Sequence, residues 1–249
     1  MSERPFLSII IATRNCKEAL AITLQQLQQA NPSFAMEILI ADAQSTDGTA
    51  ELIASQAAQL SWWVSEADAG IYDAWNKCLH QAQGQWIAFL GAGDTYTASG
   101  LEQLAGAARQ NPDSHYLSCD QWQTHADGKV MRLKKSHWHP QGFKKRMTLT
   151  HVGCWHARTA FDTYGLFDTS YRICADYAWL LRIGDALQVT LVPTPCVNML
   201  IGGISDGNSL VFDETARAQR SHTDLPAWRI QLLKQEAQLR KKIRQWLMS

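Results

Sequence analysis

Four clusters of small polar and acidic residues each follow an apolar segment in the first part of the chain. The clusters read "ATRN" (12–15), "DAQSTDGT" (42–49), "SEADAG" (65–70) and "GAGD" (91–94). Each apolar segment is typical of a buried strand, and ligands bind outside the carboxyl ends of the strands in an open α/β sheet. One cluster alone is weak evidence, because Ser, Thr, Asp and Gly are also common turn and capping residues. Four clusters in step predict one shared binding crevice.

Asp94 is the single carboxylate of the fourth cluster, where "FLGAGD" ends a strand on a turn with two glycines. An acid in that position is either an ordinary turn residue or a metal ligand that faces a substrate. Proteins commonly hold Mg²⁺ with one or two carboxylates together with substrate phosphate oxygens and water. The residue type therefore permits a metal site but does not require one.

The elements that must position these clusters alternate between strand and helix. The apolar patterns predict strands at 6–12, 36–42, 61–66 and 85–90, and helices at 16–30, 45–60 and 70–84. This alternation with short connections indicates βαβ units and a mostly parallel sheet flanked by helices, which is an α/β fold.

The second half of the chain has a looser pattern. We predict a helix at 101–110, a hairpin of strands 115–123 and 129–135 around Asp127-Gly128, and a loop at 136–148. After these we predict a strand at 151–157, a helix at 175–187, a strand at 189–193 and a Gly-rich loop at 201–209. From Trp228 the tail is expected to be helical.

The bulk composition narrows the class of protein. Apolar residues make up 46% of the 249, which suits a domain with a hydrophobic core, and 23 basic residues balance 23 acidic ones. This zero net charge argues against a nucleic-acid-binding protein, which needs a basic surplus to neutralise phosphates. Six scattered cysteines without a C-x-x-C pair indicate reduced thiols, and the sequence has no signal peptide or membrane-spanning apolar segment. We therefore expect a cytoplasmic protein.

Four segments resemble the inverting family 2 glycosyltransferases of the GT-A fold. They read "LSIIIATRN", "ILIADAQSTDGT", "SEADAGIYDAWNKCLHQAQGQWIAFLGAGD" and "ADYAWLLRIG". More narrowly, they resemble bacterial enzymes that build capsule, exopolysaccharide or lipopolysaccharide O-antigen. The resemblance implies a nucleotide-sugar-binding half at 1–95, an acceptor-binding and catalytic half of the same domain at 96–210, and a C-terminal helical tail at 211–249.

The resemblance also implies roles for three aspartates. Asp176, in "CADYAWLL", matches the general base that takes the proton from the acceptor hydroxyl. Asp42 matches the residue that reads the nucleobase. Asp94 matches the ligand of a divalent cation, Mg²⁺ or Mn²⁺, that neutralises the departing nucleoside diphosphate. Because "GAGD" lacks the acid that often precedes this position in the family, the metal requirement stays open. The plain alternative for each aspartate is a capping or turn role.

Several weaker matches complete the expected site. The resemblance implies that the nucleotide-sugar pocket is lined by Thr13, Arg14, Asp42, Glu66, Asp68, Lys77, Gly93 and Asp94. His151 matches a position near the acceptor, and Gly202, Gly203 and Ser205 belong to a loop expected to close over the donor phosphates. Arg14 and Lys77 could equally be solvated surface residues, and a lone histidine is more often structural. A Gly-rich loop also suits any turn.

The helical tail from Trp228 to Ser249 carries six basic residues and one acid, with apolar residues recurring at helical spacing. This pattern fits a helix on an anionic membrane surface and, equally well, a helix packed back on the domain. The membrane interpretation would place the protein on the cytoplasmic face of the inner membrane.

These observations together predict an inverting, metal-assisted transfer of a sugar from a nucleoside-diphosphate sugar to a growing glycan. A UDP-sugar donor and a lipid-linked acceptor are favoured. Two alternatives remain. One is a relative that binds a nucleotide sugar or glycan without turnover, and the other is a nucleotidyltransferase on a similar sheet.

Overall fold

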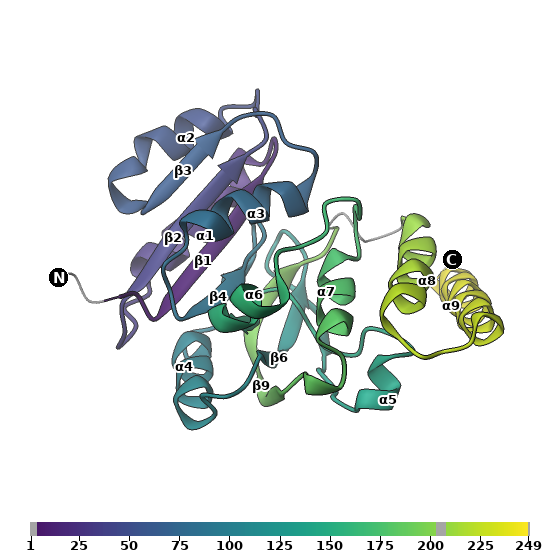
Figure 1. Cartoon of the computed structure of the whole chain (residues 1–249). Coiled ribbons are helices and arrows are strands. Elements are labelled where there is room, and N and C mark those ends of the chain that lie inside the picture. Colours follow the sequence, from purple (N-terminus) through teal and green to yellow (C-terminus); the bar gives the residue numbers. More distant parts are fainter. Residues whose placement is uncertain (1–3, 203–207, 249) are drawn as a thin grey trace.

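The computed structural model describes residues 4–202 and 208–248 (Figure 1). Over these residues one sheet has the strand order β3-β2-β1-β4-β8-β6-β9-β5, with β7 paired to β6. The strands are β1 (Leu7–Thr13), β2 (Met36–Asp42), β3 (Trp62–Ser65), β4 (Trp86–Phe89), β5 (Thr95–Tyr96), β6 (Tyr116–Thr124), β7 (Val130–Lys134), β8 (Trp155–Ala157) and β9 (Val189–Leu200). The helices are α1 (Lys17–Gln29), α2 (Thr49–Ser55), α3 (Ile71–Gln81), α4 (Gly100–Gln110), α5 (Pro140–Phe143), α6 (Arg158–Tyr164), α7 (Ala175–Ile183), α8 (Leu210–His222) and α9 (Ala227–Met248).

Strands β1 to β4 form the parallel part of the sheet. Their register sets Thr13 opposite Asp42 and Asp42 opposite Ser65, so three polar side chains meet at one edge. Strand β4 pairs with β1 on the other side, also in parallel. The apolar residues of these strands are buried between helices, as Ile10 and Leu39 show with no exposed surface. The predicted α/β fold with a mostly parallel sheet is confirmed.

The second half of the sheet is mixed. Strand β8 runs antiparallel to both β4 and β6, and the long β9 runs parallel to β6. The hairpin predicted around Asp127-Gly128 is present as β6 and β7. Strand β9 extends well past the predicted 189–193, because it continues beside β6 through two irregularities of register that accommodate Pro195.

The predicted strand at 151–157 is wrong in its first half. Residues Val152 and Gly153 form a turn, in which Gly153 has a φ of +65° and Cys154 N–H donates to the His151 carbonyl. Only Trp155–Ala157 pairs with the sheet. The predicted loop at 136–148 likewise contains the short helix α5, whose first turn is capped by the His139 ring accepting from Gly142 N–H at 3.1 Å.

The C-terminal segment forms two helices at one end of the molecule. In Figure 1, α8 lies between α7 and α9, at the end farthest from β3. Within the described residues, none of the helices has the length and apolar character needed to span a bilayer. The predicted loop residues Gly203 and Ser205 lie outside the described residues.

Candidate functional site

Asp42 ends β2 and is the centre of a buried hydrogen-bond cluster. Its Oδ1 accepts from Thr13 Oγ1 at 2.9 Å and from Ser45 Oγ at 2.5 Å. Its Oδ2 accepts from Ser45 N–H at 3.0 Å and from Ser65 Oγ at 2.7 Å. Burial acts to raise the pKa of Asp42, but these four donors outweigh it and lower the pKa below its usual value. A carboxylate has about four acceptor positions, so all of them are occupied here.

The two loops beside Asp42 are tied to each other. Asn15 N–H donates to Ser45 Oγ at 2.7 Å, and Thr46 N–H donates to Asn15 Oδ1 at 2.8 Å. Asp47 Oδ1 accepts from Thr49 N–H at 3.0 Å, which closes a local turn just before α2, whose N-cap is Gly48. Arg14 lies on this rim with an exposed side chain. The loop conformation is therefore fixed, and Arg14 faces solvent, where it can reach a bound anion.

Glu66, Asp68 and Lys77 form a second polar rim after β3. Lys77 Nζ lies 2.8 Å from Glu66 Oε1 and donates to the Ala67 carbonyl at 3.0 Å. Asp68 accepts from Gly70 N–H at 2.9 Å, just before α3. Asn76, next to Lys77, instead holds the backbone of Phe167 through both its amide atoms, at 2.9 and 3.1 Å. Glu66, Asp68 and Lys77 thus fix the segment that leads into α3. The Asn76 side chain bonds the Phe167 backbone and does not face the expected nucleotide-sugar pocket.

Asp94 lies folded into its own turn. Its Oδ2 accepts from Gly91 N–H at 3.0 Å, and its Oδ1 accepts from Leu200 N–H at 2.7 Å. Burial raises the pKa of Asp94 to about 7, against the opposing effect of these two donors. The glycines permit this arrangement. A Cβ at Gly91 would lie 2.5 Å from Asp94 Oδ2, and Gly93 has a φ of +92° with Leu200 packed against it.

A divalent cation does not fit these side chains as they stand. Asp94 is buried, with 6% of the residue exposed, and each of its carboxylate oxygens accepts a backbone N–H. The described residues also contain no group of three or more His, Cys, Asp or Glu side chains arranged to hold a metal ion. At the predicted metal site, Asp94 is thus the single candidate ligand among the described residues, and its carboxylate points into its own turn toward Gly91 and Leu200.

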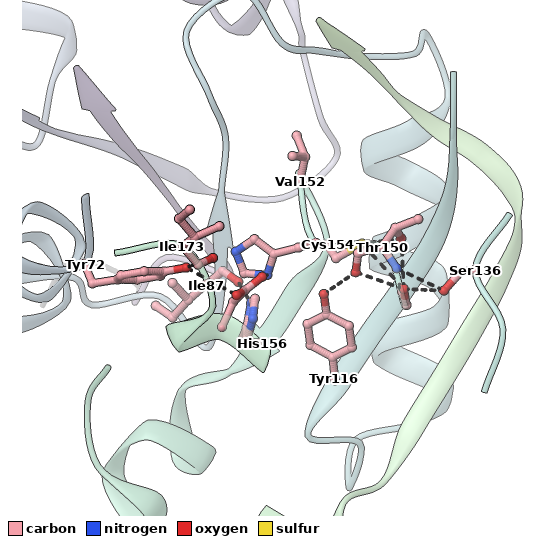
Figure 2. Close-up of polar contacts among 12 residues, drawn as sticks. Tyr72, Ile87, Tyr116, Ser136, Thr150, Val152, Cys154, His156 and Ile173 are labelled. Carbon is pink, nitrogen blue, oxygen red and sulfur yellow. Dashed lines mark hydrogen bonds and ion pairs between the residues drawn. The ribbon is translucent and has the colours of Figure 1, made fainter. Parts of the chain in front are cut away.

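Asp176 lies in the first turn of α7 beside Tyr72 and His151. Tyr72 Oη donates to the Ile173 carbonyl at 2.5 Å and lies 3.2 Å from Asp176 Oδ1. Asp176 Oδ2 lies 3.9 Å from His151 Nδ1, which is too long for a hydrogen bond. Figure 2 shows Tyr72 reaching across to Ile173. The single Tyr72 hydroxyl proton is shared between the Ile173 carbonyl and, at the longer distance, Asp176 Oδ1, and Asp176 Oδ2 has no hydrogen bond from the described residues.

Buried polar atoms without partners gather around Asp176. Both ring nitrogens of His151 and the Trp75 indole nitrogen are buried and have no hydrogen-bond partner among the described residues. The two rings lie together, with centroids 5.3 Å apart. Burial lowers the pKa of His151, partly offset by Asp176. Because buried polar groups are nearly always hydrogen-bonded, three unpartnered nitrogens in one place indicate a position that a ligand or water fills.

The turn that carries His151 is held by a series of buried hydrogen bonds. Tyr116 Oη donates to the Thr150 carbonyl at 2.5 Å, and Thr150 Oγ1 donates to the Cys119 carbonyl at 2.5 Å. Figure 2 shows Thr150, Ser136 and Tyr116 clustered beside Cys154. These bonds fix the 150–154 turn from behind, so the position of the His151 ring follows from packing.

Helix α8 anchors the segment just before Asp176. The buried Glu214 carboxylate accepts from the backbone N–H groups of Arg172 at 2.8 Å, Ile173 at 2.8 Å and Cys174 at 2.9 Å. These donors would otherwise be unpaired at the start of α7. The C-terminal segment therefore holds the loop that positions Asp176.

The sequence model of one known family, described as glycosyl transferase family 2, matches residues 8–169. The chain belongs to glycosyl transferase family 2. The resemblance found in the sequence is thereby confirmed, and the protein is a glycosyltransferase.

Similar proteins agree with this assignment. A PGL/p-HBAD biosynthesis glycosyltransferase of Mycobacterium bovis is 28% identical over 187 residues, which are 72% of this chain and 69% of that protein. TuaG of Bacillus subtilis, named for teichuronic acid biosynthesis, is 30% identical over 105 residues, or 40% of each chain.

Solved structures share the fold. S. aureus TarS 1–349 in complex with UDP-GlcNAc superposes with a TM-score of 0.66 at 15% identity, over 92% of this chain and 70% of that one. The mannosyltransferase PcManGT from Pyrobaculum calidifontis, in complex with GDP-Man and Mn²⁺, gives 0.61 at 18% identity, over 89% and 64%. The family 2 chain therefore has the GT-A-like fold expected from its sequence.

Three residues of this family 2 site were not found from the sequence. Tyr72 and Trp75 lie inside "GIYDAWNK", the segment with the most specific resemblance, but nothing in their spacing connects them to Asp176. Glu214 lies 40 residues or more from the backbone it holds. Only the tertiary contact reveals its role.

Proposed function

We propose that the chain transfers a sugar, with inversion, from a nucleoside-diphosphate sugar to a glycan hydroxyl, with Asp176 as the general base. The observation that supports this most directly is the unequal environment of its two oxygens. Tyr72 lies beside Oδ1, whereas Oδ2 lies 3.9 Å from Nδ1 of His151, whose ring nitrogens have no hydrogen-bond partner among the described residues. A base needs one oxygen that is held and another that is free to accept a proton.

The reaction follows from this arrangement. The acceptor hydroxyl gives its proton to Asp176 Oδ2 as its oxygen forms a bond to the anomeric carbon. The bond from that carbon to the diphosphate breaks at the same time, and the electron pair leaves with the nucleoside diphosphate. A single displacement of this kind inverts the anomeric centre and needs one protein carboxylate, unlike the pair of a glycosidase. The lowered pKa of His151 keeps its ring neutral at neutral pH, so it can orient a hydroxyl without adding a charge.

The nucleotide is proposed to bind over the edge formed by β1, β2 and β3, with uridine as the favoured base. Asp42 would accept the imide N–H of the base, a directional and base-selective contact. Since all four acceptor positions of Asp42 are occupied, the Ser65 hydroxyl at the edge strand must rotate away first. In this proposal the same edge is lined by Thr13, Arg14, Glu66, Asp68 and Lys77. Gly202 follows the end of β9.

A divalent cation is implied by the family resemblance, and the PcManGT structure contains Mn²⁺. Because the Asp94 carboxylate is buried and bonded to backbone N–H groups, it does not form a site for the cation as it stands. No step of the proposed reaction therefore uses the cation. The acceptor is proposed to be a growing, lipid-linked glycan. One similar glycosyltransferase is named for teichuronic acid biosynthesis.

The Asp176→Asn variant tests the general base. Asn can still accept from Tyr72 through its oxygen, so the melting temperature should stay close to wild type. We expect kcat for sugar transfer to fall about 10²- to 10⁴-fold, the usual contribution of a positioned base. Binding of nucleoside diphosphates should be unchanged. Full transfer activity in this variant would remove Asp176 from the mechanism.

The nucleobase assignment has its own test. The melting temperature is measured with UDP, GDP, CDP and dTDP, because a ligand that binds only the folded state stabilises it by about 2.7 kcal/mol at a hundred times its Kd. We expect UDP to give the largest shift. Asp42→Ala should abolish that shift, whereas Ser65→Ala should preserve or increase it by freeing one acceptor position. Loss of the shift in Ser65→Ala would show that the hydroxyl, and not Asp42, contacts the base.

A second candidate is a family member that binds a nucleotide sugar without transferring it. The inward carboxylate of Asp94 and its two glycine neighbours are the observation that favours this possibility. A clear nucleotide-dependent rise in melting temperature, together with no release of nucleoside diphosphate from any donor and acceptor pair, would identify it.

A further inference from the structure

Helix α9 buries some apolar side chains against α8 and leaves others exposed. Against α8 the helix buries Ile230 and Leu233, which are 1% and 8% exposed. Lys234 Nζ also lies 2.5 Å from Asp213 of α8. Five large apolar side chains of α9 remain exposed, and these are Trp228, Leu232, Leu239, Ile243 and Trp246. We call these five residues the outer stripe.

The outer stripe lies along one side of the helix in two groups, Trp228 with Leu232 and Leu239 with Ile243 and Trp246, separated by Gln235 and Glu236. At about 100° per residue its members fall within roughly 60° of one another around the axis. They extend over about 27 Å, at 1.5 Å per residue. Their exposure ranges from 39% for Leu232 to 76% for Trp246. Five large apolar side chains exposed on one side of a helix mark an interaction site rather than scattered surface residues.

The charges of α9 define the kind of partner. The segment from Trp228 to Ser249 contains six basic residues and one acid, giving a net charge of 6 − 1 = +5. The one acid, Glu236, already lies 3.8 Å from Arg229 and 3.5 Å from Arg240. Lys242 and Arg240 flank the outer stripe on opposite sides by helical spacing. An apolar stripe flanked by cations is complementary to a layer of anionic headgroups over acyl chains.

We propose that the outer stripe of α9 binds the surface of an anionic lipid membrane, with the helix axis in the plane of the interface. The two tryptophans near the ends of the stripe support this, since their amphipathic rings favour the headgroup region. A second copy of the chain is a poorer partner, because stripe-to-stripe pairing would bring two helices of net charge +5 together.

Helix α9 is linked to the proposed base through α8. Helix α9 packs on α8, and Glu214 of α8 holds the backbone that precedes Asp176. The docked helix is therefore connected to the proposed base through two direct contacts. This inference does not depend on the proposed reaction, because it is tested by binding alone.

The test is co-sedimentation of the full chain with vesicles. One set is phosphatidylcholine alone, and the other contains roughly one phosphatidylglycerol in three lipids. We expect binding to the anionic vesicles only, and weaker binding at high salt. The variant Leu239→Gln/Ile243→Gln should reduce the partition coefficient by about tenfold or more. Ile22→Gln on α1 is the matched control, since Ile22 is 53% exposed elsewhere, and it should bind as wild type.

A second variant keeps the inference testable if the first one unfolds. Arg240→Gln/Lys242→Gln leaves the outer stripe intact and should weaken binding to the anionic vesicles severalfold. Light scattering of the wild type without lipid is measured alongside. Equal vesicle binding by wild type and Leu239→Gln/Ile243→Gln would overturn the proposal. So would a wild-type dimer that this variant converts to a monomer, combined with no vesicle binding, because the outer stripe would then be a protein interface.

Discussion

Asp94 and Leu200 are 106 positions apart in the chain, yet the Leu200 N–H donates to Asp94 Oδ1 at 2.7 Å. This bond joins the turn after β4 to the end of β9. Leu200 also packs against Gly93, which lies next to Asp94. The carboxylate that the sequence suggested as a metal ligand therefore connects the two halves of the sheet.

The buried Asp94 predicts a specific pH dependence of stability. Its pKa is raised from 3.8 to about 7 by burial, so the folded state favours the protonated form. The stability that follows is fully present below about pH 4 and is lost as the pH rises through 7. At about 1.4 kcal/mol per unit, the total loss is about 4 kcal/mol, of which about 3 kcal/mol falls above pH 5. Urea unfolding of wild type and Asp94→Asn at pH 5 and pH 8.5 measures that part.

The Asp94→Asn variant lacks this ionisation, and its amide group cannot accept one of the two backbone N–H bonds. We therefore expect wild type to be clearly more stable than the variant at pH 5, with a smaller advantage at pH 8.5. A constant difference between the two proteins at both pH values would show that Asp94 does not titrate in this range.

Gly91→Ala should displace the Asp94 carboxylate, since the added Cβ would lie 2.5 Å from Asp94 Oδ2. We expect a loss of about 1–3 kcal/mol in the free energy of unfolding, the cost of leaving buried partners unpaired. Gly106→Ala is the control. Gly106 lies within α4 with nothing within 4 Å of an added Cβ, so this change should stabilise by about 0.5–1 kcal/mol. Chemical denaturation compares the two, and equal effects would contradict the packing argument.

Tyr72→Phe should lower kcat by about tenfold and leave the donor KM unchanged. The lost hydroxyl contacts Asp176 Oδ1 and the Ile173 carbonyl, so the base is held less firmly, but no contact to the proposed nucleotide edge is lost. Steady-state kinetics over a range of donor concentrations separates the two parameters. Tyr164→Phe on α6 serves as a control for removing a tyrosine hydroxyl elsewhere. A rise in KM with kcat unchanged would place Tyr72 in donor binding instead.

Glu214→Gln should impair catalysis from a distance. The amide group cannot accept all three backbone N–H bonds from Arg172, Ile173 and Cys174, which leaves a buried donor unpaired at about 1–3 kcal/mol. We expect a lower melting temperature and a lower kcat for sugar transfer. Asp213→Asn, one position earlier on α8, is the control because its ion pair with Lys234 is at the surface and contributes little. If both variants lost similar amounts of melting temperature and kcat, the effect would come from α8 as a whole and not from the Glu214 hydrogen bonds.

The sequence by itself determined the elements whose pattern is local. The apolar strands β1 to β4, the helices between them and the polar cluster after each strand all follow from periodicity and turn chemistry, because these depend on neighbouring residues. The sequence motifs also identified the family correctly, since "GIYDAWNK" to "GAGD" lies within the matched residues. Asp176 and His151, named separately from sequence, lie together in the structure.

Tertiary structure decided what each side chain does. The sequence placed Asp94 at the end of a strand, but only the return of β9 turned its carboxylate toward Leu200. Asn76 and Lys77 are neighbours in sequence on α3, yet their partners are Phe167 and Glu66. Glu214 had no local signal at all. A hydrogen bond needs two groups within about 3 Å, and in these cases chain segments distant in sequence supply the second group.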